Sequence, residues 1–287
     1  MGESTDAEQP LIVDDRLGRN LLFTTALIRV TGPYGSGSGT GFFYDASVGS
    51  RANESIPVLV TNRHVVEHAS SGDFQMIREG QPGQPQLGSA VKIAFTAEDW
   101  TLHPDPEIDV AVVAIGGVLN DLRERDQAVF MRQITHQLLP TPDVIDDLDV
   151  MEPVVFVGYP SGLHDTKNLT PIIRRGTTAT PVQLDHGGKP EFLIDASVFP
   201  GSSGSPVFLV QEGSYREGDH YVLSGGLRVL FLGIVAAVHK RTVSGQLIVA
   251  TSLNVEVDEL IDLGVVYKWS AIDEAVTHLL ELRGIDR

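Results

Sequence analysis

The sequence contains no cysteine, which excludes disulfide bonds, thiolate metal sites and a cysteine nucleophile. The folded chain must therefore rely on its core for stability. At 287 residues it is long enough to bury a full core, either as one large domain or as two small ones. Its hydrophobic content of 42% and its 29 glycines are typical of a globular β protein with many turns.

Long hydrophobic runs are also missing. No stretch reaches the roughly 18 consecutive apolar residues that a membrane-spanning helix needs. Residues 1–10 are polar and acidic, without the basic segment and the following apolar segment of a secretory signal peptide. We therefore expect no membrane partner and a cytoplasmic location in a bacterium.

Basic residues are scarce relative to acidic ones. Lys and Arg number 21 against 38 Asp and Glu, which gives a net charge of −17. Such a chain is repelled by the phosphates of nucleic acids and by anionic membrane surfaces. The charge therefore excludes nucleic acid as a partner, and we interpret it as a means of keeping the protein soluble.

Short segments rich in β-branched and aromatic residues, separated by turn residues, predict an all-β sandwich or barrel. Residues 1–20 are expected to form a flexible arm. Strands are expected over 21–31, 39–44, 58–61, 89–95, 109–115, 154–160, 172–180, 192–196, 205–210, 221–238 and 247–252. Helices are expected over 117–133 and 270–284, the second with an apolar stripe that ends at Gly284. The acidic segment 140–153 is expected to connect two halves.

Three short motifs carry the chemistry. In chain order they are 61–66 with His64, 108–113 with Asp109, and 201–206 with Ser203. A hydroxyl nucleophile needs a base to take its proton, and the base needs a carboxylate to fix its tautomer. His64 ends a buried strand, Asp109 precedes an apolar run, and glycines on either side of Ser203 allow a tight turn that exposes the hydroxyl. These settings suit the three roles.

Each motif has a less specific interpretation. Asp105, between two prolines, competes with Asp109 for the carboxylate role, although prolines favour a turn there. His68 follows His64 at the spacing of a metal pair, but no Glu stands in the place that a zinc-protease helix requires. The glycine-rich segment 32–41 lacks the ending of a phosphate-binding loop. We expect neither a metal nor a cofactor.

The three motifs together resemble those of the chymotrypsin-fold serine proteases, closest to the bacterial branch with the HtrA proteases and the glutamyl endopeptidases. The resemblance covers roughly residues 21–263. It implies two six-stranded antiparallel β-barrels followed by a C-terminal helix. The first barrel, within 21–150, would carry His64 and Asp109, and the second, within 151–287, would carry Ser203. Too few residues follow Ser203 for the PDZ domain of the HtrA proteases.

The resemblance also assigns the binding groups. The backbone N–H groups of Gly201 and Ser203 would form the oxyanion hole. The substrate pocket would be lined by the residues that match its base and walls, namely Ser197, Val198, Phe199, Pro200, Ala236, Ala237 and Val238. Because no acidic residue stands at the pocket base and Val238 replaces a common glycine, we expect a small or medium apolar residue before the cleaved bond. His239 keeps an acidic residue open as the alternative.

Three departures from the family pattern stand near the nucleophile. Ser202 replaces the Asp that pairs with a freed N-terminus in trypsin-like zymogens, Ser205 replaces a common glycine, and Ala236 replaces a Ser that supports the catalytic Asp. We therefore expect a serine endopeptidase acting on proteins or peptides, with restricted activity or activation by a regulatory protein partner. The alternatives are a protease-fold module that binds peptides without cutting them, and an esterase with the same triad.

Overall fold

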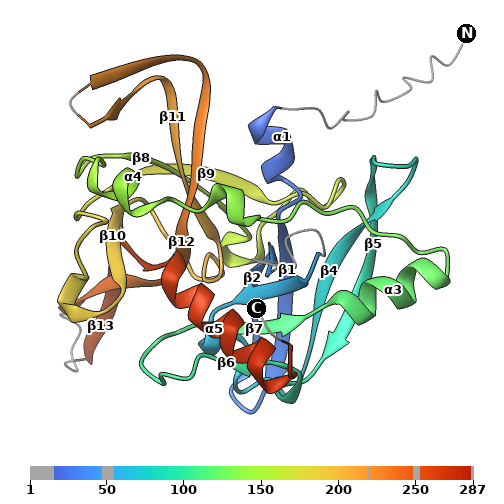
Figure 1. Cartoon of the computed structure of the whole chain (residues 1–287). Helices are drawn as coiled ribbons and strands as arrows, with labels where there is room; N and C mark the ends of the chain where they lie inside the picture. Colours follow the sequence, from blue (N-terminus) through green and yellow to red (C-terminus); the bar gives the residue numbers. More distant parts are fainter. Residues whose placement is uncertain (1–15, 47–54, 219, 248–252, 286–287) are drawn as a thin grey trace, which may run out of the picture.

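The computed structural model describes residues 16–46, 55–218, 220–247 and 253–285. Two β lobes lie side by side, and the C-terminal helix α5 lies across their junction (Figure 1). Of the expected N-terminal arm, residues 1–15 lie outside the described residues, whereas Leu17–Leu21 form helix α1. The strand expected over 247–252 also lies outside them, except for its first residue.

The first lobe is an antiparallel sheet of seven strands in the order β5-β4-β1-β2-β3-β7-β6. It therefore has one strand more than the predicted six-stranded barrel, and strand β4 had no counterpart among the predicted strands. Strands β1 and β2 form a tight hairpin at the glycine-rich segment. The strands are β1 (Thr25–Gly32), β2 (Gly35–Asp45), β3 (Pro57–Thr61), β4 (Ser71–Glu79), β5 (Pro85–Phe95), β6 (Thr101–Leu102) and β7 (Ala111–Ala114).

The second lobe is a closed barrel of six strands in the order β10-β13-β12-β11-β8-β9, as predicted. Strands β11 and β12 are longer than predicted, and their hairpin extends beyond the barrel (Figure 1). The strands are β8 (Pro153–Gly158), β9 (Ile172–Thr178), β10 (Glu191–Asp195), β11 (Pro206–Glu217), β12 (His220–Leu247) and β13 (Leu253–Lys268). The all-β fold with a C-terminal helix is confirmed.

The helices are short except for the last. They are α1 (Leu17–Leu21), α2 (Arg63–Val66), α3 (Gly116–Glu124), α4 (Pro142–Asp146) and α5 (Trp269–Leu282). The predicted helix 117–133 was wrong in its second half, because Asp126 has a φ of 55° and the chain then turns back. Phe130 leaves the helical pattern and packs against Phe23, at 4.9 Å between ring centroids. Among the described residues, no helix is long and apolar enough to cross a lipid bilayer.

One hydrophobic cluster joins the two lobes. Phe42 of the first lobe and Phe231 of the second pack with their ring centroids 5.4 Å apart. Helix α5 adds its buried face to the same cluster, including Ile272 and Leu279, both at most 1% exposed. Burying this apolar surface fixes the edges of the two lobes that face each other. The division at residue 150 into two domains stays a prediction.

Candidate active site

His64 and Asp109 meet at the end of strand β3. The short helix α2 begins directly after β3 and carries His64, while Asp109 stands two residues before strand β7, which pairs with β3. Asp109 Oδ2 lies 2.6 Å from His64 Nδ1, and Asp109 Oδ1 accepts a hydrogen bond from the backbone N–H of His64 at 2.9 Å. Both carboxylate oxygens of Asp109 therefore bind the same residue, His64. The imidazole keeps its proton on Nδ1 and leaves Nε2 as the basic nitrogen.

Two further residues fix the backbone around Asp109. Asn62 donates a side-chain hydrogen bond to the carbonyl of Asp109 at 2.7 Å, and the Tyr267 hydroxyl donates one to the carbonyl of Glu107 at 3.0 Å. Burial raises the pKa of the Tyr267 phenol, and the carboxylates of Glu191 and Asp109 raise it further, so the group remains a donor. These bonds support Asp109 where Ala236 lacks the hydroxyl of the family pattern.

Asp105, the competing carboxylate, is occupied elsewhere. Its side chain accepts a hydrogen bond from the backbone N–H of Glu107 at 2.9 Å, and its own N–H donates to His103 Nδ1 at 3.0 Å. Burial lowers the pKa of His103, whose side chain is 1% exposed, so this imidazole is neutral and acts as an acceptor at Nδ1. Asp105 and His103 thus shape the turn that leads to Asp109.

Ser203 stands in a tight turn between β10 and β11. Gly201 and Gly204 have φ values of 85° and 90°, a region that favours glycine. A side chain at Gly204 has no room, since an added Cβ would lie 1.7 Å from the carbonyl oxygen of Thr40. The glycines on both sides of Ser203 are therefore required by the backbone.

Every backbone carbonyl from residue 199 to residue 203 accepts a hydrogen bond. Those of 199 and 202 are bound by the N–H groups of Ser202 and Ser205 at 2.9 and 3.0 Å, within the turn. Those of 200, 201 and 203 are bound by Ser161 N at 2.5 Å, Thr40 Oγ1 at 3.0 Å and Thr40 N at 2.9 Å. In a trans peptide the N–H points opposite to the C=O, so bonds to the carbonyls also orient the N–H groups. The N–H groups of Gly201 and Ser203 have no acceptor among the described residues.

The hydroxyl of Ser203 donates to the carbonyl of Ala236 at 3.3 Å. Within the described chain no hydrogen bond joins Ser203 to His64. A rotation about χ1 is the movement that brings a serine hydroxyl from one partner to another. The structure thus brings His64 and Asp109 into direct contact and places Ser203 in a separate, glycine-bounded turn.

The two serines next to the nucleophile are buried. Ser202 is 1% exposed and Ser205 is 0% exposed, and neither hydroxyl has a partner among the described groups. Because Ser202 carries no carboxylate, it cannot form an ion pair with a chain terminus. A neutral side chain at this place is consistent with its burial.

The residues expected to line the substrate pocket lie in two segments. Val198 is 3% exposed and Phe199 is 41% exposed, while Pro200 accepts the bond from Ser161 described above. In strand β12, Ala236 is 3% exposed. Ala237 and Val238 pair through their backbones with Val265 and Gly264 of β13, and their side chains lie outside the description. Ser197 is partly exposed at the end of β10.

Arg174 of strand β9 adds a charge beside this segment. Its guanidinium lies 4.9 Å from the centre of the Phe199 ring and 5.3 Å from that of Phe156. Burial lowers its pKa, and the charge of Asp262 partly opposes that effect. One of its terminal nitrogens is buried without a hydrogen-bond partner among the described residues. No sequence motif indicated this residue.

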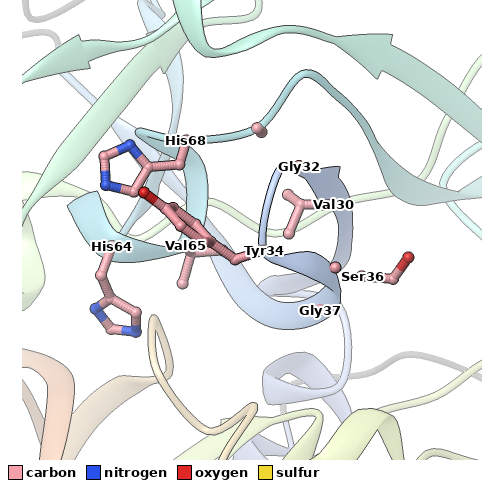
Figure 2. A pocket seen from close by; sticks show the side chains of 10 residues that line it. Val30, Gly32, Tyr34, Ser36, Gly37, His64, Val65 and His68 are labelled. Atoms are coloured by element: carbon pink, nitrogen blue, oxygen red, sulfur yellow. The ribbon is translucent and has the colours of Figure 1, made fainter.

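A cavity of about 220 Å³ adjoins His64 and is lined by residues of the first lobe. It is lined by the β1–β2 hairpin and helix α2 (Figure 2). Tyr34 and His68 lie edge to face, with ring centroids 5.8 Å apart, and Val65 forms an apolar wall. The glycine-rich segment thus forms one wall of a cavity, and most of it lies within strand β2, whereas a phosphate-binding loop leads into a helix. Among the described residues no group of three His, Asp or Glu side chains is placed to hold a metal ion.

Comparison with known families identifies the class. Residues 39–215 match the family described as trypsin-like peptidase domain. This match includes His64, Asp109 and Ser203 and covers more than half of the chain. The chain belongs to this family and is a serine endopeptidase, a hydrolase.

Solved structures with a similar fold include serine proteases, all at low sequence identity. A thermostable serine protease from an extremophilic microorganism has a TM-score of 0.49 at 12% identity, covering 90% of this chain and 97% of that chain. An HtrA-type protease with a bound tripeptide has a TM-score of 0.48 at 17% identity, covering 91% of this chain and 62% of that chain. The serine endoprotease from Yersinia pestis has a TM-score of 0.48 at 15% identity, covering 94% and 68%. No curated protein sequence matches the chain.

Proposed function

We propose that the chain cleaves peptide bonds with a triad of His64, Asp109 and Ser203 through an acyl-enzyme. The observation that carries this proposal is that Asp109 accepts two hydrogen bonds from His64, at 2.6 and 2.9 Å. A carboxylate that binds both the ring and the backbone of one histidine fixes its tautomer and its orientation. It also stabilises the imidazolium that forms when the ring accepts a proton.

The proposed reaction assigns a step to each of these groups. Nε2 of His64 takes the proton of Ser203, and Oγ of Ser203 attacks the carbonyl carbon of the substrate. The negative oxygen accepts hydrogen bonds from the N–H groups of Gly201 and Ser203, and loss of one such donor typically lowers the rate by about 10²–10³. His64 then gives its proton to the leaving amine, and the acyl group remains on Ser203. A water molecule deprotonated by His64 attacks the acyl carbon, and the carboxylic product leaves as the proton returns to Ser203.

The cavity beside His64 lies on the leaving side of this reaction. The acyl half of the substrate is held by Ser203 and its oxyanion donors in the second lobe. The amine that leaves must lie within reach of His64, in the first lobe. The cavity walled by Tyr34, Val65 and His68 would therefore receive a side chain from the leaving half (Figure 2).

The preferred type of residue before the cleaved bond remains a prediction with two alternatives. The buried Val198 supports a small or medium apolar residue, whereas Arg174 next to Phe199 supports an acidic one. Cleavage of a peptide library by the wild type and by Arg174→Ala separates them. An acidic preference that disappears in the variant assigns the role to Arg174, and an apolar preference unchanged in the variant assigns it to the pocket walls.

A restricted activity has support in the orientation of Ser203. Its hydroxyl is bonded to Ala236 and not to His64, so the nucleophile must rotate before it reacts. A regulatory protein that favours this rotation would switch the enzyme on. The bacterial, cytoplasmic location stays a prediction from the sequence.

Active-site labelling tests the proposal. A fluorophosphonate probe is expected to modify Ser203 in the wild type, to fail with Ser203→Ala and to react more slowly with His64→Ala. Ser202→Ala is the matched control, because it removes only a buried hydroxyl without a described partner. Labelling that persists in Ser203→Ala would contradict the triad. Probe labelling with cleavage of esters but not of peptides would favour an esterase, and peptide binding without labelling would favour a non-cutting module.

A further inference from the structure

Thr40 occupies the place where the two lobes meet behind the nucleophile. It lies in the middle of strand β2 of the first lobe and is 0% exposed. Its neighbours across the junction are the turn with Ser203 and the end of strand β8. The residue is polar, and a buried polar side chain is retained at low cost only when its hydrogen bonds are made.

All four polar functions of Thr40 are used. Its hydroxyl donates to the carbonyl of Gly201 at 3.0 Å and accepts from the backbone N–H of Tyr159 at 3.0 Å. Its backbone N–H donates to the carbonyl of Ser203 at 2.9 Å. Its own carbonyl accepts from the hydroxyl of Thr61 at 2.7 Å. One residue thus contacts the nucleophile turn twice and the end of strand β3 once.

These contacts bear directly on the oxyanion donors. In each of the two donor residues, Gly201 and Ser203, the N–H and the carbonyl lie on either side of the same Cα atom. Holding both carbonyls limits the rotation of the backbone at the two donor residues, of which Gly201 is intrinsically the more flexible. The contact with Thr61, three residues before His64, relates these donors to the general base.

We propose that Thr40 is a positioning residue that orients the oxyanion N–H groups of Gly201 and Ser203 relative to His64. The proposal rests on the proposed function. Thr40 does not touch the reacting atoms, and its effect passes through the two carbonyls that it holds. The hydroxyl is the part that a conservative substitution removes, because the backbone contacts remain whichever residue stands there.

The expected consequence is a loss in the transition state and not in the binding of the substrate. A misaligned oxyanion donor weakens the interaction with the negative oxygen, which exists only after attack. Thr40→Val, which keeps the shape and removes the hydroxyl, is expected to lower kcat about 10- to 100-fold with little change in KM. A peptide boronic acid, whose adduct is tetrahedral, should lose affinity by a similar factor. Thr40→Ser, which keeps the hydroxyl, should restore most of both.

The experiment measures kcat, KM and boronic acid affinity for the wild type and these two variants, with thermal unfolding as a check on folding. Thr40→Ala removes the same two side-chain bonds if valine cannot be accommodated. Thr31→Val is the matched control in the same hairpin, because the Thr31 hydroxyl contacts only the exposed Ser36 hydroxyl, at 3.2 Å. It is expected to leave all three quantities unchanged.

The outcomes separate the two proposals. Loss of kcat and of boronic acid affinity in the valine or alanine variant, with recovery in Thr40→Ser, supports the positioning role. Wild-type turnover in Thr40→Val, an equal loss in Thr40→Ser, or a change in KM alone overturns it. A folded wild-type chain that neither turns over peptides nor reacts with the fluorophosphonate contradicts the proposed function itself.

Discussion

The Tyr267 hydroxyl of strand β13 donates a hydrogen bond at 3.0 Å to the carbonyl of Glu107, two residues before Asp109. The second lobe thereby supports the segment of the first lobe that carries the proposed orienting carboxylate. Ala236 of strand β12 has no hydroxyl that could support Asp109. Tyr267 of the neighbouring strand β13 instead contacts the segment before Asp109. It links the position of Asp109 to the barrel that carries Ser203.

Tyr267→Phe is expected to lower kcat/KM several-fold, because the segment before Asp109 loses its contact with the second lobe. Removing one partner of a partly buried hydrogen bond typically costs about 1 kcal/mol of stability. Steady-state kinetics and thermal unfolding check both effects. Tyr34→Phe is the control for stability, since the Tyr34 side chain is 88% exposed. Unchanged kinetics in Tyr267→Phe would show that Asp109 is held by Asn62 and His64 alone.

Asp109→Asn and Asp105→Asn decide between the two carboxylates. An asparagine at 109 offers an N–H where His64 needs an acceptor, so the imidazole takes the wrong tautomer and kcat is expected to fall by about 10⁴. An asparagine at 105 still accepts the bond from Glu107 through its side-chain oxygen, so activity should stay near that of the wild type. The measurement is hydrolysis of a peptide or ester substrate. The opposite ranking would assign the orienting role to Asp105.

Stability is expected to fall at acid pH through His103. Burial lowers its pKa below the ordinary value of 6.5, so the unfolded state binds a proton more readily than the folded state. The stabilisation is therefore complete above pH 6.5 and is lost as the pH falls through the lowered pKa of the folded state. Glu274 and Asp105 face the ring and oppose the shift without reversing it.

Thermal unfolding between pH 8 and pH 4 checks this expectation in the wild type and in His103→Asn. An asparagine keeps an acceptor near the position of Nδ1 and has no proton to gain in this range. The difference between the two melting curves should therefore widen below pH 6.5. Parallel curves over the whole range would remove His103 as a cause of acid sensitivity.

Tyr34→Ala is expected to alter the choice of the acyl acceptor that takes the acyl group from Ser203. During hydrolysis of an ester, an added amino acid amide competes with water for the acyl-enzyme, and its success reports binding on the leaving side. We expect aromatic amides to react several-fold less well with Tyr34→Ala, because the ring that faces His68 is lost. Tyr34→Phe keeps the ring and should behave as the wild type. The rate of acylation by the ester serves as the internal reference, and a parallel fall in that rate would locate the effect outside the cavity.

Local chemistry explains why the triad candidates could be found from the sequence. His64 ends an apolar strand, and glycines bound Ser203, so each residue carries its signal within a few neighbours. The contacts that support them carry no such signal. Thr40 and Gly201 are 161 residues apart, and Tyr267 and Glu107 are 160 apart. An isolated threonine or tyrosine in a strand predicts only a strand.

The same limit explains the errors in secondary structure. The apolar spacing that predicted a helix over 117–133 includes Val129 and Phe130. These two residues are apolar because they pack in the first lobe, not because they lie on a helix. Val129 pairs with Arg78 of strand β4, and Phe130 donates its backbone N–H to the carbonyl of Ile77 at 2.8 Å. Pairing with a distant strand thus replaced the local pattern after Glu124. Strand β4 itself, which supplies this partner, was not predicted.

Helix α5 belongs by sequence to the second lobe, yet its buried face is packed into the cluster that also contains Val60 and Val112 of the first lobe. Any opening of the lobes about a hinge would expose this apolar face to water and raise the free energy. The packing of helix α5 therefore disfavours a hinged opening of the two lobes.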